Sequence, residues 1–252
     1  MKNILFTICG RAGSKGIKNK NIRNFCGYPL PYYTLSAIDL FIKRHPENNY
    51  KIVLNTDSIE LIDLVSKNKM RSVNVIKRPP ELSGDLVGKV EVIRNCLESM
   101  EDECNIKFDA VVDCDITSPL RTVNDIENLL KVHFSKTPDV TTSVTSARRN
   151  PYFNQVMKTE KGFKKVISSN YTARQQAPEI FDMNASLYAY SPEFLRSGKG
   201  VLDGYCEITE MYDTAVLDLD HENDFELMEV IAQYLFVHKD EFKDVKNNIV
   251  VS

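Results

Sequence analysis

The chain has 252 residues, of which 42% are hydrophobic and 27% are charged, and its formal net charge at pH 7 is −3. This length can bury a substantial core, and the slightly acidic balance argues against wholesale nucleic-acid binding. No apolar run is long enough to span a bilayer, so we expect no membrane partner. The six cysteines and four histidines lack metal-site spacings, which predicts a cytoplasmic protein with reduced thiols.

Short apolar runs alternate with amphipathic segments along the chain. Residues 3–9, NILFTIC, are continuously apolar, as in strands buried on both faces of a parallel sheet. Asp57 is the expected N-cap of the second helix. The predicted strands are residues 3–9, 51–57, 72–76, 109–115, 139–147, 184–191 and 214–220, and the predicted helices are residues 31–42, 60–69, 88–100, 123–134 and from 223 onward. This order predicts a doubly wound α/β fold with a mostly parallel sheet.

The alternation of strands and helices breaks after Ala147. Residues 153–167, FNQVMKTEKGFKKVI, have the pattern of a hairpin that turns at Lys161–Gly162, outside the main sheet. We therefore expect a single domain over residues 1–252 with a small inserted segment at about residues 148–182.

Charge is distributed unevenly along the chain. Residues 1–38 carry six Lys or Arg and no Asp or Glu, whereas residues 200–238 carry ten Asp or Glu and no Lys or Arg. Such asymmetry commonly reflects two solvated surfaces. The other interpretation is that the basic end binds an anion and the acidic end holds a cation.

The loop after the first strand is rich in glycine and in cations. Its glycines follow the pattern G-x-x-G-x-x-G at Gly10, Gly13 and Gly16, and five Lys or Arg lie between residues 8 and 25. A loop at the carboxyl end of a parallel strand can bind phosphate through backbone N–H groups. The spacing matches neither the dinucleotide fingerprint nor the P-loop, so a plain turn is the competing interpretation. The crowded cations favour an anion ligand, because an anion relieves their repulsion.

Five segments of the chain carry a resemblance to a known family. They are RAGSKGIKNKN at residues 11–21, KRPPELSGD at 77–85, TSPLR at 117–121, RQQAP with MNASLY at 174–188, and LDLDHENDFEL at 217–227. In this order they resemble the signature segments of the acylneuraminate cytidylyltransferases, the CMP-sialic acid synthetases. The resemblance implies a nucleotide-diphospho-sugar transferase-like fold and an enzyme that joins CTP to a nine-carbon 2-keto sugar acid, a nonulosonic acid, with release of pyrophosphate.

The same resemblance implies roles for individual residues. The triphosphate would be held by Arg11, Ser14, Lys15 and Lys20 with the backbone of Gly13, and Lys15 or Arg11 would stabilise charge on the departing pyrophosphate. The implied nucleotide-binding set also includes Asn21, Arg78 and Asp85, and the implied sugar-binding set is Asp115, Phe153, Arg174, Gln175 and Asn184. For Arg78 the competing interpretation is a structural residue at the end of a strand, placed there by Pro79.

Two carboxylates near the C-terminus, Asp218 and Asp220, complete the expected site. Alternation along a strand would place both on one face, where they can share Mg²⁺. A pair of solvent-facing residues is the competing interpretation, and the family resemblance favours the metal site. For Asp115, which follows the fourth strand, a metal contact and a contact to a sugar hydroxyl are both open. No histidine stands out as the general base.

Two segments depart from the sialic acid enzymes. FDMN at residues 181–184 places Asp182 where a cation is common, and RRNPYFN at residues 148–154 places Phe153 where a sugar-contacting lysine is common. Both segments look more like the branch of the family that activates legionaminic acid, which predicts a role in bacterial surface glycan synthesis. The resemblance also implies a homodimer, because the inserted segment of the family pairs with its mate.

Other functions stay open at this point. The chain can instead be a CMP-Kdo or CMP-pseudaminic acid synthetase, which are nucleotidyltransferases of other branches. It can also be a catalytically silent nucleotide-binding relative, or an unrelated α/β binding protein. The loop cations and both C-terminal carboxylates are present, which argues against the silent relative.

Overall fold

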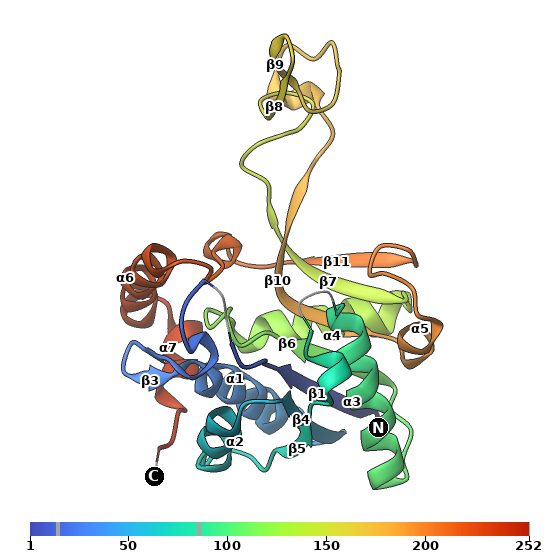
Figure 1. The fold of residues 1–252 in the computed structure, drawn as a ribbon, viewed down its shortest axis with the longest axis vertical. Helices are drawn as coiled ribbons and strands as arrows, with labels where there is room; N and C mark the ends of the chain where they lie inside the picture. Colours follow the sequence, from blue (N-terminus) through green and yellow to red (C-terminus); the bar gives the residue numbers. More distant parts are fainter. Residues whose placement is uncertain (14–15, 85–86, 252) are drawn as a thin grey trace.

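A seven-stranded sheet forms the centre of the molecule (Figure 1). The computed structural model describes residues 1–13, 16–84 and 87–251. The strands of this sheet are β1 (Asn3–Cys9), β4 (Asn49–Thr56), β5 (Asn74–Lys77), β6 (Ala110–Cys114), β7 (Val140–Ser146), β10 (Phe181–Tyr190) and β11 (Cys206–Glu210). Their order is β11-β7-β10-β6-β1-β4-β5, and only β10 runs antiparallel to its neighbours. The predicted α/β fold with a mostly parallel sheet is confirmed.

Helices cover both faces of the sheet. They are α1 (Leu30–Arg44), α2 (Ile59–Ser66), α3 (Lys89–Cys104), α4 (Val123–Lys136), α5 (Pro192–Ser197), α6 (Glu222–His238) and α7 (Asp240–Asn247). One core cluster joins Phe6 and Val112 of the sheet to α1, α2, α4, α6 and α7, and the other joins Leu5 and Val111 to α3 and α5. The central strands are therefore buried on both faces, as their unbroken apolar runs predicted. No helix in the described ranges is long and apolar enough to cross a membrane.

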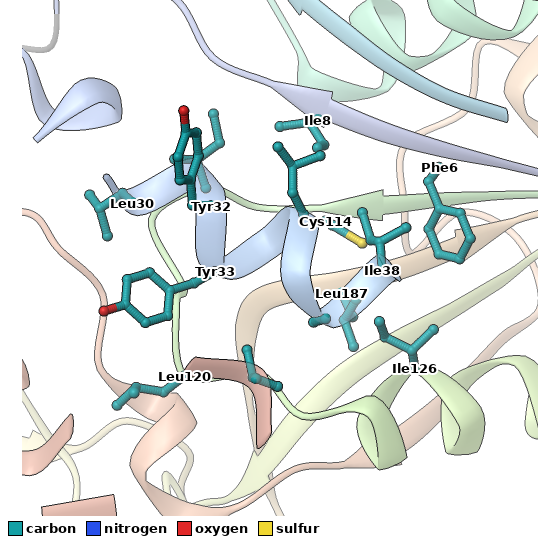
Figure 2. Close-up of a cluster of buried hydrophobic side chains, with 14 of the residues drawn as sticks. Phe6, Ile8, Leu30, Tyr32, Tyr33, Ile38, Cys114, Leu120, Ile126 and Leu187 are labelled. Atoms are coloured by element: carbon teal, nitrogen blue, oxygen red, sulfur yellow. The ribbon is translucent and has the colours of Figure 1, made fainter. Parts of the chain in front are cut away.

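Helix α1 supplies much of the larger core cluster. Figure 2 shows Ile38 of α1 beside Phe6 of β1 and Cys114 of β6, with Leu30 and Tyr33 of α1 farther away in the same cluster. The buried hydroxyl of Tyr33 donates a hydrogen bond of 2.7 Å to the carbonyl of a residue in the short hairpin of β2 (Asn24–Phe25) and β3 (Tyr28–Pro29), so it is satisfied without water.

The strand order reverses its direction at β1. The chain passes from β1 to β4 and β5 on one side and then crosses to β6 on the other side. In open α/β sheets, ligands bind at such a switch point, outside the carboxyl ends of the strands. The first loop follows β1 and Asp115 follows β6, so both lie at this position.

The chain between β7 and β10 projects from the sheet as an arm, seen at the top of Figure 1. The arm contains β8 (Val156–Thr159), β9 (Gly162–Lys165) and the 3-10 turn η3 (Arg174–Gln176). Strands β8 and β9 pair with each other and not with the main sheet. The predicted hairpin is present, and Gly162, with a φ of +99°, supplies the left-handed backbone next to the turn.

Two local predictions were wrong, and some elements were missed. Residues 214–220 form no strand but lie partly in the 3-10 turn η4 (Asp213–Val216), and the edge strand is β11, which was missed. The N-cap of α2 is Ser58, whose hydroxyl accepts a hydrogen bond of 3.2 Å from the N–H of Leu61. Asp57 instead accepts a hydrogen bond of 2.7 Å from the N–H of Ala12. The helices α5 and α7 were also missed.

Strand β10 is irregular opposite β7. Its pairing register shifts between Met183 and Tyr188, and Ala185 has a φ of 54°, in the left-handed region. Ala185 therefore pays a conformational cost that glycine avoids.

We expect Ala185→Gly to stabilise the protein. A left-handed residue with a Cβ costs about 1–2 kcal/mol, whereas glycine loses about 0.5–1 kcal/mol through backbone entropy. The free energy of unfolding in urea should therefore rise by up to about 1 kcal/mol. Ala189→Gly is the matched control, because Ala189 is buried in a regular part of the same strand and its replacement should lower stability. Equal losses in both variants would show that Ala185 is not strained.

Candidate active site

A cleft of about 480 Å³ opens at the carboxyl ends of β1 and β6. The first loop, the chain after β5, the start of α3 and the acidic segment 217–220 all contribute to its wall. Six of the residues predicted from the sequence line this cleft: Arg11, Lys20, Asn21, Arg78, Asp115 and Asp220. The cleft thus brings together the basic and the acidic ends of the chain.

The first loop is tied to the neighbouring strand and to itself. The N–H of Gly10 donates a hydrogen bond of 3.2 Å to the carbonyl of Asn55 in β4, and the amide of Asn21 donates one of 3.1 Å to the carbonyl of Arg11. A Cβ on Gly10 would lie only 2.8 Å from Leu61, so glycine permits this close packing. The ends of the loop are therefore fixed in place before any ligand binds.

Three predicted residues of the nucleotide set, Ser14, Lys15 and Asp85, lie outside the described residues. Gly13 is described and exposed, with a φ of +73°. Glycine adopts this left-handed conformation without steric cost, which suits a turn that presents backbone groups to a ligand.

The first loop touches the acidic segment directly. The Nζ of Lys20 donates a hydrogen bond of 2.6 Å to the carbonyl of Leu219 and lies 3.5 Å from the carboxylate of Asp220. A Cβ on Gly16 would lie 2.0 Å from the carbonyl oxygen of Asp220, so only glycine allows this approach. Part of the charge asymmetry of the sequence therefore meets in one cleft, which Arg11 and Lys20 line from the basic end and Asp220 from the acidic end.

Arg78 lies at the end of β5 and is almost fully buried. Its Nε donates a hydrogen bond of 2.8 Å to the side chain of Asn55, and its Nη2 donates one of 3.0 Å to the Asn55 carbonyl. The amide of Asn55 donates in turn to Asn95. Arg78 thus holds the strand ends together, as expected of a structural residue, and it also lines the cleft, as expected of a nucleotide-binding residue.

Lys89, the first residue of α3, was missed by the sequence analysis. Its Nζ lies 2.6 Å from Asp115 and 2.7 Å from Asp113, and it lines the cleft. Burial opposes ionisation of Asp115, but the charge and hydrogen bond of Lys89, with those from Thr117, lower the pKa of Asp115 to about 2. A cation at a helix N-terminus is unfavourable with the helix dipole, and this local conflict was the signal available in the sequence.

Of the two C-terminal carboxylates, Asp220 lines the cleft, and Asp218 lies close enough to interact electrostatically with Asp115 and Lys89. Partial desolvation and the charges of Asp115 and Asp220 together raise the pKa of Asp218 to about 6, against the opposing charges of Lys20 and Lys89, although its side chain keeps exposed surface. The expected placement of Asp218 and Asp220 on one face of a strand is wrong, because their segment is irregular. They nevertheless act on each other, so negative charge accumulates here.

The donor set suits a hard cation that also binds phosphate. Within the described ranges, no three His, Cys, Asp or Glu side chains form a metal-binding group. Mg²⁺ in nucleotide sites commonly takes one or two carboxylates and completes its shell with water and phosphate oxygens. The excess negative charge around Asp218 and Asp220 fits that requirement.

The predicted sugar-binding residues of the arm lie apart from the cleft. Arg174 and Gln175 line a second cavity of about 290 Å³ beside the end of β7, and this cavity shares no lining residue with the cleft. Phe153 belongs to the arm and is not among the described residues that line either cavity. One copy of the chain therefore does not bring these residues to Asp115.

Asn184, the last predicted sugar ligand, is buried in β10. Its carbonyl oxygen accepts a hydrogen bond of 2.6 Å from the hydroxyl of Ser143 and one of 3.2 Å from the N–H of Ser186. Its amide nitrogen lies 3.5 Å from the sulfur of Met211. The side chain is thus engaged within the sheet, and its contact with a sugar stays a prediction.

Comparisons with known proteins point to one family. Residues 5–241 match the family described as Cytidylyltransferase. The chain is 33% identical over 234 residues to post-translational flagellin modification protein B of Campylobacter coli, covering 92% of this chain and 96% of that protein. It is 32% identical over 232 residues to CMP-N,N'-diacetyllegionaminic acid synthase of Campylobacter jejuni, covering 92% and 95%.

The fold is also similar to that of a solved structure. The CMP:2-keto-3-deoxy-manno-octonic acid synthetase complexed with CTP superimposes with a TM-score of 0.63 over 92% of this chain and 100% of that chain. The two sequences are 15% identical, so this likeness concerns the fold alone.

Proposed function

The chain belongs to the cytidylyltransferase family, and from this premise we propose that it joins CTP to a nonulosonic acid and releases pyrophosphate. The observation that carries the proposal is the cleft at the switch point of the sheet, where Arg11 and Lys20 face Asp115 and Asp220. A basic loop suits a triphosphate, and acceptor groups beside it suit a polyhydroxylated sugar acid.

The reaction places one clear demand on the cleft. The anomeric hydroxyl of the acid attacks the α-phosphorus of CTP and loses its proton, while the bond from that phosphorus to the pyrophosphate oxygen breaks. Negative charge builds on the departing pyrophosphate, so fixed cations accelerate the step. Arg11 and Lys20 line the cleft, and the contact of Lys20 with Leu219 holds its ammonium group in place.

Mg²⁺ belongs to the same proposal. Asp218 and Asp220 would hold it, and when bound it would neutralise phosphate charge. Asp115 has a lesser claim to the metal, because one of its oxygens already accepts two hydrogen bonds from Thr117 and the other is paired with Lys89. These contacts favour the sugar hydroxyl as its ligand.

We propose a legionaminic acid as the preferred sugar. The relative named CMP-N,N'-diacetyllegionaminic acid synthase and the phenylalanine at position 153 both support this choice. The relative named for flagellin modification supports a bacterial surface glycan as the destination. All six cysteines are free, which suits synthesis in the cytoplasm.

Release of pyrophosphate tests the function directly. The purified protein should release it when CTP and Mg²⁺ are supplied with N,N'-diacetyllegionaminic acid, and it should do so more slowly with N-acetylneuraminic acid, pseudaminic acid or Kdo. Equal or faster release with N-acetylneuraminic acid would overturn the choice of sugar. No release with any of the four acids would overturn the activity itself.

The arm is the proposed dimer contact. Its apolar side chains are unusually exposed, with Val156 61% and Phe163 71% accessible, and Met157 is exposed as well. Exposed apolar groups gathered on one projection are typical of a surface that another chain covers. A partner's arm would bring its Arg174 to the cleft, where one copy of the chain alone lacks it.

A mixed dimer tests this arrangement. The variants Arg174→Ala and Asp220→Asn, carrying different affinity tags, should each be inactive as homodimers. In a purified mixed dimer, one site combines an intact cleft with an intact arm, so we expect about half of the wild-type turnover. An inactive mixed dimer would show that the arm and the cleft of the same chain act together. A mass corresponding to a monomer, measured by light scattering, would refute the proposed dimer.

A further inference from the structure

The floor of the cleft holds a lysine between two aspartates, and the first loop contributes none of these residues. The Nζ of Lys89 lies 2.6 Å from Oδ2 of Asp115 and 2.7 Å from Oδ2 of Asp113. Asp113 is completely buried in β6, where Oδ1 accepts a hydrogen bond of 2.8 Å from the hydroxyl of Thr7. Buried Asp113 therefore fixes the ammonium group of Lys89, and Lys89 lines the cleft.

The hydrogen-bonding capacity of this group is only partly used. Oδ1 of Asp115 accepts from both the N–H and the hydroxyl of Thr117, at 2.8 and 2.7 Å, which fills its lone pairs. Oδ2 of Asp115 accepts from Lys89 alone and keeps one acceptor position. Lys89 has three N–H groups, and two carboxylates face it. One donor on Lys89 and one acceptor on Asp115 thus stand side by side.

The charges of the group decide what can bind there. Two carboxylates and one ammonium sum to −1, so a phosphate or carboxylate is repelled, and the first loop is the better place for such groups. A hydroxyl group donates one hydrogen bond and accepts others at a single oxygen, so it can satisfy both neighbours at once. A trans amide cannot, because its N–H and C=O point in opposite directions.

We propose that Lys89 and Asp115 together bind a hydroxyl group of the sugar acid, with Lys89 donating and Asp115 accepting, and that Asp113 positions Lys89 for this contact. The inference rests on the proposed function and adds Lys89 as a substrate contact. A pyrimidine edge also offers neighbouring donor and acceptor atoms. The apolar side chains suited to a flat ring, Leu82 and Val87, line the same cleft, so the separate KM values for CTP and for the sugar acid decide between the two ligands.

Two variants separate this contact from a structural role. Lys89→Met removes the donor but also leaves buried Asp113 without its cation, which lowers stability. Lys89→Met with Asp113→Asn removes the uncompensated charge as well. We expect the double variant to recover the wild-type melting temperature while its KM for N,N'-diacetyllegionaminic acid stays about 10- to 100-fold raised, the loss typical of a hydrogen bond to a charged group. Its KM for CTP should change by less than about threefold.

Lys43→Met is the matched control. Lys43 lies 2.7 Å from Asp39, another buried carboxylate, but belongs to α1 and does not line the cleft. It should cost stability and leave both KM values unchanged. The second measurement uses deoxy analogues of N-acetylneuraminic acid, each of which lacks one hydroxyl. One analogue should bind the wild type at least about tenfold more weakly than N-acetylneuraminic acid does. The double variant should bind that analogue and N-acetylneuraminic acid equally well.

The outcomes are distinct. Recovery of the sugar KM in the double variant would show that Lys89 only neutralises Asp113, and a rise confined to the KM for CTP would assign the pair to the pyrimidine. Either result overturns the inference. If the wild type turns over none of the acids, the proposed function fails. Calorimetric binding of the acids to the wild type and the double variant still decides the contact: equal affinities refute it, and weaker binding by the double variant supports it.

Discussion

Replacement of Asp218 or Asp220 by asparagine should reduce turnover by at least about 100-fold. Both residues are exposed, and their negative charge accumulates beside the cationic loop that would hold the triphosphate. Asparagine keeps the shape of the side chain and removes the charge that a divalent cation needs. The rate of pyrophosphate release at saturating CTP and sugar acid is the measurement.

Asp213→Asn is the matched control for these variants. Asp213 belongs to the same acidic part of the chain and is exposed, but it pairs with Arg148 at 2.6 Å and does not line the cleft. Its replacement should leave the rate unchanged, and all three variants should keep the wild-type melting temperature, because exposed carboxylates are rarely part of the core. Chelation of divalent cations should stop the wild-type reaction. A wild-type rate in Asp218→Asn or Asp220→Asn, or one unaffected by chelator, would remove the metal assignment.

The fold was predictable where burial on both faces leaves a continuous apolar run, as in NILFTIC. The fold was not predictable where apolar and polar residues alternate in a segment that is not a strand. The alternating LDLD at residues 217–220 predicts a strand, but Leu219 is fully buried against the core while Asp220 lines the cleft. The true edge strand β11 offers only Ile208 between polar residues, because an edge strand needs less apolar surface.

The candidate site was predictable where a motif concentrates charge in one stretch of chain. Arg11 and Lys20 of the first loop and Asp220 of the acidic segment all line the cleft, although about 200 residues separate the two segments in sequence. Lys89 was not predictable in this way, because its role depends on Asp113 and Asp115, which reach it only through the packing of α3 on β6. The separation of Arg174 from the cleft likewise depends on the direction in which the arm projects. No pattern in the sequence predicts that direction.

Gly16→Ala should reduce kcat/KM by about 100-fold with little change in stability, because a displacement of about 1 Å in a catalytic site has effects of this size. The added Cβ would lie 2.0 Å from the carbonyl oxygen of Asp220, and a backbone atom cannot move aside alone. The first loop and the acidic segment must therefore separate. Lys20 would then lose its positions beside Leu219 and Asp220, which hold it in the cleft.

Gly84→Ala provides the comparison that isolates this steric effect. Gly84 lines the same cleft, but among the described residues its added Cβ would meet only the side chain of Val87, at 3.6 Å, an ordinary contact. Its kcat/KM should stay within about threefold of the wild type. If the added methyl group acts through the distance between loop and acidic segment, Gly16→Ser should be as impaired as Gly16→Ala, since both carry the same Cβ. Equal activity of Gly16→Ala and Gly84→Ala would mean that the close approach of the two segments is not needed for turnover.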